Sequence, residues 1–134
     1  MFGLSPDHEE FRALVRDFAE AEIAPHVAEW DRTSHFPADL IPRMGELGMF
    51  GLVVPEEFGG TRKAEGAGAD EGGGDFTMLC VAIEELGRID QAIGITLEAG
   101  VGLGINPILN YGTPEQKARW LPDLAAGRHL AGFG

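Results

Sequence analysis

Apolar residues recur three and four positions apart along much of this chain, which is the spacing of amphipathic helices. The first such run follows Ser5-Pro6-Asp7, where the serine can cap a helix and the proline suits its first turn. Pro25 should end or kink this helix, with a further turn reaching about Trp30. Its predicted apolar face, which needs a partner, consists of Phe11, Leu14, Val15 and Phe18.

A second helix is predicted between Pro37, which can open it, and Gly48, which suits a helix C-terminus. Its apolar face consists of Leu40, Ile41, Met44 and Leu47. Turns are expected at Pro55 and at Gly59-Gly60. Residues Thr61–Gly74 are rich in glycine and lack periodicity, so we expect a mobile loop. Because the loop is acidic, follows no predicted strand and lacks a closing Lys-Ser or Lys-Thr, a nucleotide-binding role is disfavoured.

A third helix is expected to be capped by Asp75 and to end at Gly87. Its inward-facing residues are predicted to be Phe76, Leu79, Ile83 and Leu86. The next run, Ile89–Asn110, is apolar on nearly all sides, which predicts a central helix buried all round. If this prediction holds, Leu103→Ala should lower the free energy of unfolding by about 2–5 kcal/mol.

Four glycines interrupt this central run, although each costs roughly 1 kcal/mol against alanine in a helix. Two reasons for them stay open, namely close packing of helices or room for a ligand beside the backbone. They are Gly94, Gly100, Gly102 and Gly104.

The last helix is predicted to begin at Thr113, with Pro114 in its first position, and to end at Gly127. Its inward residues are expected to be Trp120, Leu121 and Leu124. Residues Leu130–Gly134 then alternate like the opening of a β-strand, although nothing earlier offers a sheet. The predicted fold class is therefore all-α, a bundle of about five helices over residues 1–128, followed at 129–134 by the start of another element.

Length and charge narrow the possible functions. The chain has 134 residues, enough for one core, and a formal net charge of −12. That charge argues against nucleic acid and against anionic membrane surfaces as partners. The single cysteine, Cys80, excludes an internal disulfide and favours a cytoplasmic location. We find no secretion signal and no apolar run that reaches the length of a membrane span.

Few residues suggest chemistry. The four histidines show no metal-ligand spacing, so zinc is not expected. Cys80 is interpreted as an inert core thiol. Sequential acid pairs such as Glu84-Glu85 point about 100° apart on a helix and are interpreted as solvated faces.

Glu98 is the exception, because it is a carboxylate in the most apolar run. Burial of such a group is costly unless it is paired or neutral. It either meets a basic group such as Arg88 or Arg119, or it lines a cavity with a raised pKa.

Four stretches, taken in order, resemble the N-terminal helical domain of the acyl-CoA dehydrogenases. They read "FAEAEIAPHVAEWDRTSHFP", "LIPRMGELGMFGLVVPEEFGG", "AIEELGRID" and "NPILNYGTPEQKARWLPDLAAGRHLAGFG". The resemblance covers almost the whole chain apart from Thr61–Gly74. It implies that residues 129–134 open a middle β-domain and that the catalytic glutamate of most members lies further along, so no residue here is assigned as catalytic.

The resemblance also implies a reaction and a set of contacts. The reaction is α,β-dehydrogenation of an acyl-CoA thioester, in which a base removes the α-proton and a hydride passes to FAD. Phe133 matches an aromatic position beside the flavin in some members. The helix 95–107 matches the one that closes the far end of the acyl pocket, which makes Glu98, Val101, Gly102 and Ile105 the expected wall residues. A flavin-linked electron acceptor and a homo-oligomer are also implied.

Two alternatives stay open. Acyl-CoA oxidases and some flavin monooxygenases share this architecture. A non-enzymatic helical interaction module is the other, in which an uncovered apolar surface binds a partner or a second copy.

Overall fold

The fold was analysed in a computed structural model, which describes residues 3–62, 76–132 and 134. These residues form seven α-helices, and the all-α prediction is confirmed. The helices are α1 (Pro6–Phe18), α2 (Val27–Thr33), α3 (Leu40–Glu46), α4 (Phe76–Ile89), α5 (Gln91–Ala99), α6 (Asn106–Tyr111) and α7 (Pro114–Ala125). Two π-helical segments, η1 (Ala19–Ile23) and η3 (Gly100–Ile105), and a 3-10 turn, η2 (Glu56–Phe58), complete the order.

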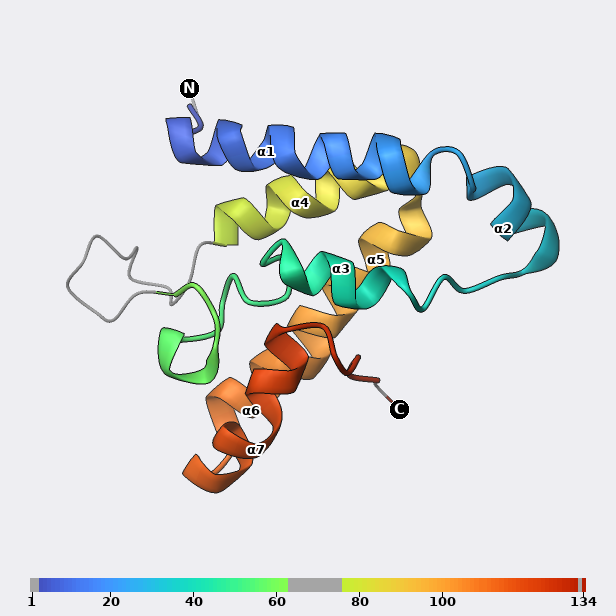
Figure 1. Ribbon diagram of the computed structural model, residues 1–134. Helices are drawn as coiled ribbons and strands as arrows, with labels where there is room; N and C mark the ends of the chain where they lie inside the picture. Colours follow the sequence, from blue (N-terminus) through green and yellow to red (C-terminus); the bar gives the residue numbers. More distant parts are fainter. Residues whose placement is uncertain (1–2, 63–75, 133) are drawn as a thin grey trace.

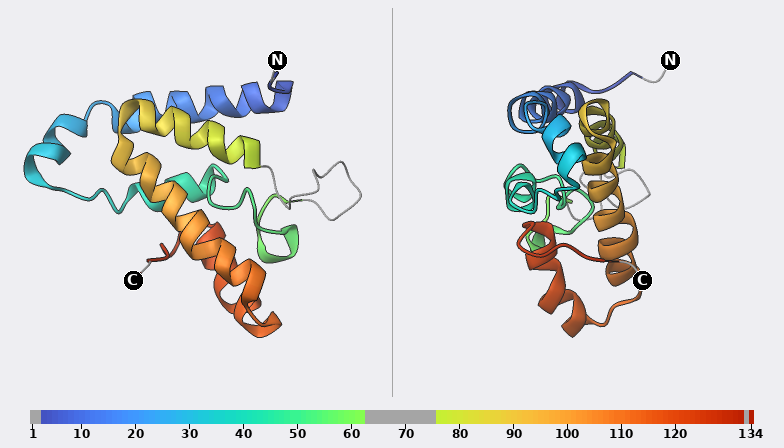
Figure 2. Two further views of the ribbon diagram at one scale, coloured as in Figure 1. Left: turned by 180° about the vertical axis from the view of Figure 1, so that it is seen from behind. Right: turned by 90° about the vertical axis from the view of Figure 1, so that its right-hand side faces the viewer.

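The helices are arranged in three tiers (Figure 1). Helices α1 and α4 lie side by side at one end, α3 crosses the middle, and α6 and α7 run antiparallel at the other end. The continuous helix from α5 through η3 to α6 connects the first tier to the last, as both views in Figure 2 show. Helix α2 projects from this body and has no buried residue.

Helix ends follow the sequence signals closely. The Ser5 hydroxyl accepts a hydrogen bond from the His8 N–H, and Thr113 and Gln116 form a capping box at the start of α7. Gly48 and Gly127 have positive φ angles of 80° and 67°, as expected for residues that end helices. Helix α4 passes Gly87 and ends at Ile89. The predicted cap Asp75 and most of the predicted loop Thr61–Gly74 lie outside the described residues.

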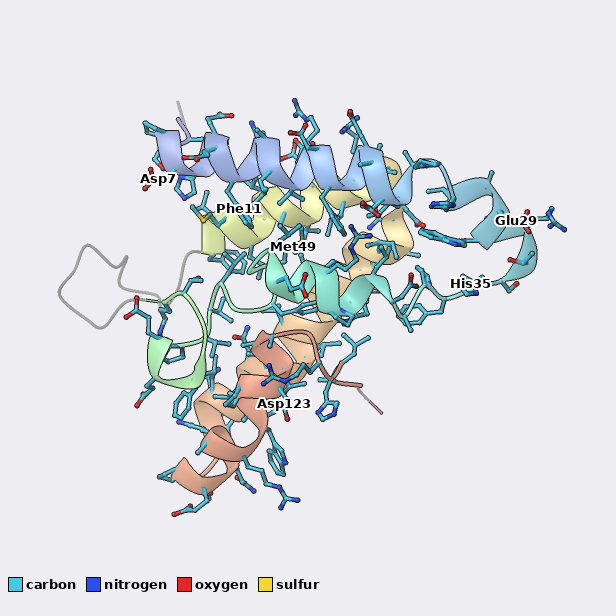
Figure 3. All side chains as sticks on the ribbon, viewed as in Figure 1. Asp7, Phe11, Glu29, His35, Met49 and Asp123 are labelled. Carbon is cyan, nitrogen blue, oxygen red and sulfur yellow. The ribbon has the colours of Figure 1, made fainter. Side chains whose placement is uncertain are left out.

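One core connects the tiers, and it includes Val15, Phe18, Leu86, Leu97 and Leu121. Met49 is fully buried near the centre of the molecule, whereas Glu29 and His35 lie on and beside the projecting α2 (Figure 3).

Three residues of the predicted apolar faces are exposed instead. Leu14 is 42% exposed on α1, Phe76 is 67% exposed at the start of α4, and Trp120 is 41% exposed on α7. The terminal residues Leu130–Gly132 have no regular secondary structure. Because a strand requires a partner, the β-strand over 130–134 stays a prediction about a longer chain.

Candidate functional site

The central helix has one buried and one uncovered side. Ile93 and Leu97 are buried, whereas Ile95 is 51% exposed and Leu103 is 44% exposed. The prediction that this helix is buried all round was therefore wrong. The large cost predicted for Leu103→Ala does not follow either, because truncating a half-exposed leucine leaves no closed cavity.

The four expected wall residues are divided between these two sides. Val101 and Ile105 are buried in the core, with 0% and 1% of their surface exposed. Glu98 is exposed and Gly102 is partly exposed, on the uncovered side. A ligand lying along the helix could touch Glu98 and Gly102 directly, while Val101 and Ile105 hold the helix against the core behind them.

Glu98 is not the buried acid that the sequence suggested. Its side chain is exposed, so it needs neither a basic partner nor an enclosing cavity. One carboxylate oxygen, Oε1, lies 3.0 Å from the place that a Cβ on Gly102 would occupy. The missing side chain of Gly102 thus leaves room for the Glu98 carboxylate to lie along the helix surface.

The glycines of this helix serve different purposes. A Cβ on Gly94 would lie 3.2 Å from the backbone of Gly87, and one on Gly100 would lie 3.0 Å from the Phe50 ring. A Cβ on Gly104 would lie 2.2 Å from the Ala131 Cβ. Close packing therefore explains these three, while the space beside Gly102 is occupied only by the flexible Glu98 side chain.

The helix is also irregular at the same place. Residues Gly100–Ile105 form a π-helical segment, in which the Asn106 N–H donates to the Val101 carbonyl five residues earlier. Such segments occur frequently at functional sites. Three of the six residues in this segment are glycines, which fit its close contacts and wider turn.

A buried carboxylate does exist, but at Glu85, which we expected to be solvated. Glu85 is 2% exposed, and both its oxygens accept hydrogen bonds from Arg16, at 2.7 and 2.9 Å. Arg88 donates to it at 3.3 Å, and the Arg12 Nε, itself buried without a hydrogen bond, lies 3.6 Å away. The hydrogen bond from Arg16 is the main cause that lowers the pKa of Glu85, against the opposing effect of burial. This cluster joins α1 to α4 and has a structural role.

Two surface grooves lie away from the central helix's wall residues. One runs between α1 and α3, where Glu22 and Arg43 form an ion pair, and the Arg43 hydrogen bond lowers the pKa of Glu22. The other lies beside α2 and is lined in part by Trp30, His35 and Asp90. Neither groove includes Glu98, Val101, Gly102 or Ile105.

Potential metal ligands are not grouped in the described residues, and the single thiol lies on the surface. No group of three metal-ligating side chains exists among residues 3–62, 76–132 and 134. Cys80 is exposed, so its interpretation as a core thiol was wrong.

The described part of the chain contains one helix, Gln91–Tyr111, that is long and apolar enough to cross a membrane by length and composition. The expectation that no apolar run reaches that length was therefore wrong. A core helix of a soluble protein passes the same test, and 39% of the apolar window is buried here.

The residues at hand do not by themselves fit a flavin site. Phe133, the one position expected beside the flavin, lies outside the described residues. The preceding residues, Leu130 and Ala131, pack on the glycines of η3 and offer no charged or hydroxyl side chain. Leu130 and Ala131 therefore supply no polar side chain to a flavin.

Comparison with known proteins is consistent across sequence and structure. Residues 5–128 match the sequence model of the acyl-CoA dehydrogenase N-terminal domain. A probable acyl-CoA dehydrogenase of Bacillus subtilis, YngJ, is 39% identical over 99% of this chain and 32% of its own length. The butyryl-CoA dehydrogenase structure from Megasphaera elsdenii aligns with a TM-score of 0.83 and 35% identity, over 97% of this chain and 32% of that one. A glutaryl-CoA dehydrogenase bound to glutaryl-CoA aligns with a TM-score of 0.86 and 34% identity, over 100% and 32%. The chain thus spans about a third of the length of the relatives it matches.

Proposed function

This chain belongs to the acyl-CoA dehydrogenase family, as its N-terminal helical domain, and from that premise we propose that it forms part of an acyl-pocket wall in a flavin-dependent acyl-CoA dehydrogenase. The proposed reaction of the whole protein introduces an α,β double bond into an acyl-CoA thioester. FAD supplies the redox chemistry in such an enzyme, while the residues of this domain position the substrate and exclude water.

The uncovered apolar side of the helix Gln91–Tyr111 carries this proposal. A pocket for an acyl chain needs an apolar wall with little side-chain bulk, and Gly102 between Ile95 and Leu103 provides one. Val101 and Ile105, packed in the core, hold that wall rigidly from behind. Glu98 is the one charged residue of the helix Gln91–Tyr111 and should disfavour long apolar chains near it.

Replacing Gly102 with leucine in the complete enzyme should shorten the pocket. We expect kcat/KM for long acyl-CoA substrates to fall by at least about tenfold relative to short ones, since one methylene in a pocket is worth about 1–3 kcal/mol. The fold should tolerate the change, because only the flexible Glu98 side chain lies within 4 Å of the new Cβ, on a partly exposed side of the helix. Steady-state kinetics over a series of acyl-chain lengths measures this effect.

The matched control is Ala13→Leu, which adds a leucine at an exposed position of α1. It should leave the chain-length profile unchanged. An equal loss for every acyl chain in Gly102→Leu, or no loss at all, would contradict a role of this helix in the pocket.

The 134-residue chain alone should not retain flavin. We expect no absorbance near 450 nm, roughly where oxidised flavins absorb, after the purified chain is incubated with FAD and desalted, since the cofactor must be held largely by other parts of the protein. A helical circular dichroism spectrum would show that the sample is folded. Retained flavin would mean that these helices hold more of the cofactor site than we propose.

The remaining parts of the proposal concern the longer protein. We propose that residues 1–128 form the helical domain and that residues 129–134 begin a middle β-domain. We also propose that the whole protein passes electrons to a flavin-linked acceptor, forms a homo-oligomer and is located in the cytoplasm. Relatives and solved structures named as dehydrogenases favour this reaction over the oxidase, monooxygenase and interaction-module alternatives.

A further inference from the structure

The residues after α7 rest in a notch on the central helix. Gly100 and Gly104, four residues apart on η3, are both buried and present bare backbone toward the terminal segment. A Cβ on Gly104 would lie 2.2 Å from the Ala131 Cβ. One on Gly100 would lie 3.0 Å from the Phe50 ring and 3.2 Å from the Leu130 Cδ1, so Gly100 faces both. Ordinary contact between carbon atoms needs about 3.5–4.0 Å, so Ala131 occupies the space that a side chain at position 104 would take.

Backbone hydrogen bonds reach only the beginning of this segment. The Arg128 and His129 N–H groups donate hydrogen bonds to the Asp123 carbonyl. Within the described part of the chain, no hydrogen bond fixes Leu130–Gly132. Packing, including the contacts of Leu130 and Ala131 with the glycine notch, therefore holds this segment.

We propose that the notch formed by Gly100 and Gly104 is a positioning site, which fixes the segment leaving the domain relative to the acyl-pocket wall. The inference rests on the proposed function, in which Gly102 lines the pocket, and on the family resemblance, which implies that the segment leads to an aromatic residue, Phe133, beside the flavin. The glycines of one helix then serve both tasks: Gly102 lies in the proposed pocket wall beside Glu98, and Gly100 and Gly104 contact the exit segment. A side chain at position 104 would displace the segment and with it the geometry between substrate and flavin.

The test is an exchange of side-chain size in the complete flavoenzyme. Gly104→Ala adds a methyl group that collides with Ala131, and Gly104→Ala combined with Ala131→Gly removes the methyl group that it meets. Gly87→Ala is the control for glycine replacement within a helix, because its Cβ would approach only the flexible Gln91 side chain, at 3.1 Å. Three readouts are measured: hydrogen exchange of the peptide 128–134, the visible spectrum of the bound flavin, and kcat/KM.

We expect Gly104→Ala to speed exchange of this peptide, shift the flavin spectrum and lower kcat/KM by roughly 10–100-fold, as a misplacement of about 1 Å can cost about 10²-fold. The double variant should recover most of all three, and Gly87→Ala should change none. Unaltered exchange in Gly104→Ala, or no recovery in the double variant, overturns the proposal. Faster exchange with an unshifted spectrum and normal kcat/KM also overturns it, because the notch would then hold the segment without positioning anything that matters for the reaction.

Failure of the proposed function can be distinguished from failure of the notch proposal. If the unaltered complete protein neither binds flavin nor dehydrogenates any acyl-CoA, the proposed function is wrong, whereas the exchange measurements still report whether the notch seats the segment.

Discussion

Gly45→Ala is expected to lower the free energy of unfolding by about 3 kcal/mol, at the upper end of the usual cost of overpacking. Gly45 lies on α3, where a Cβ would come within 2.1 Å of the Ala126 carbonyl oxygen and 2.6 Å of the Gly127 nitrogen. Backbone atoms cannot rotate aside as a side chain can, so the two segments must separate. Urea unfolding measures the loss as a lower midpoint with an unchanged slope.

Gly87→Ala again provides the comparison for this change. Its new methyl group meets only a flexible side chain, and alanine favours a helix over glycine by about 1 kcal/mol, so this variant should be neutral or more stable. If Gly45→Ala and Gly87→Ala unfold at the same urea concentration, the backbone of α3 does not contact the backbone at the end of α7 as described.

Glu85→Gln is expected to cost about 3 kcal/mol at pH 7, the lower end for breaking a buried ion pair because its partner Arg16 is half exposed. The amide has nearly the shape of the carboxylate but replaces one acceptor oxygen with a donor. That donor would face guanidinium N–H groups of Arg16 and Arg88, which are donors too. Urea unfolding at pH 7 measures the difference from the unaltered protein.

The same variant should also change how stability depends on pH. The Arg16 hydrogen bond holds the pKa of Glu85 below its ordinary value of 4.5. A lowered carboxyl pKa contributes stability that is present above the unfolded value and lost as pH falls through the folded value. The difference in the free energy of unfolding between the unaltered protein and Glu85→Gln should therefore be largest at pH 7. It should shrink below about pH 4.5.

Glu84→Gln is the matched control, because Glu84 is the sequence neighbour of Glu85 and its side chain is 68% exposed. Its contact with Arg12 is 3.4 Å long and solvent-exposed, and such pairs contribute about 0–1 kcal/mol. A similar loss of unfolding free energy in both variants would contradict a stabilising role of the buried Glu85 cluster. So would a loss for Glu85→Gln that is as large in acid as at pH 7.

Local signals in the sequence predicted helix ends well. Ser5 and Thr113 cap through their own side chains, and the residues that complete each cap lie three positions away. Such information is contained within a few neighbouring residues, so sequence reasoning can recover it. The all-α class and the family followed from the same kind of evidence.

Burial of single residues was harder to predict, because it depends on distant parts of the chain. Glu84 and Glu85 look alike in sequence, and only the docking of α1, about 70 residues earlier, decides that Glu85 is enclosed by arginines. The most apolar run suggested burial all round, yet Leu103 and Glu98 lie on its uncovered side. Apolar composition indicates that a surface will be covered, but it does not indicate whether the same domain covers it.

The pairing of α1 with α4 has a consequence for synthesis on the ribosome. Val15 and Phe18 of α1 are covered in part by α4, whose first buried residue is Leu79, roughly 60 residues later. At about 5–20 residues per second, the apolar face of α1 waits several seconds for its partner to emerge. The nascent chain is therefore open to chaperones, and to aggregation with other chains, until α4 has left the exit tunnel.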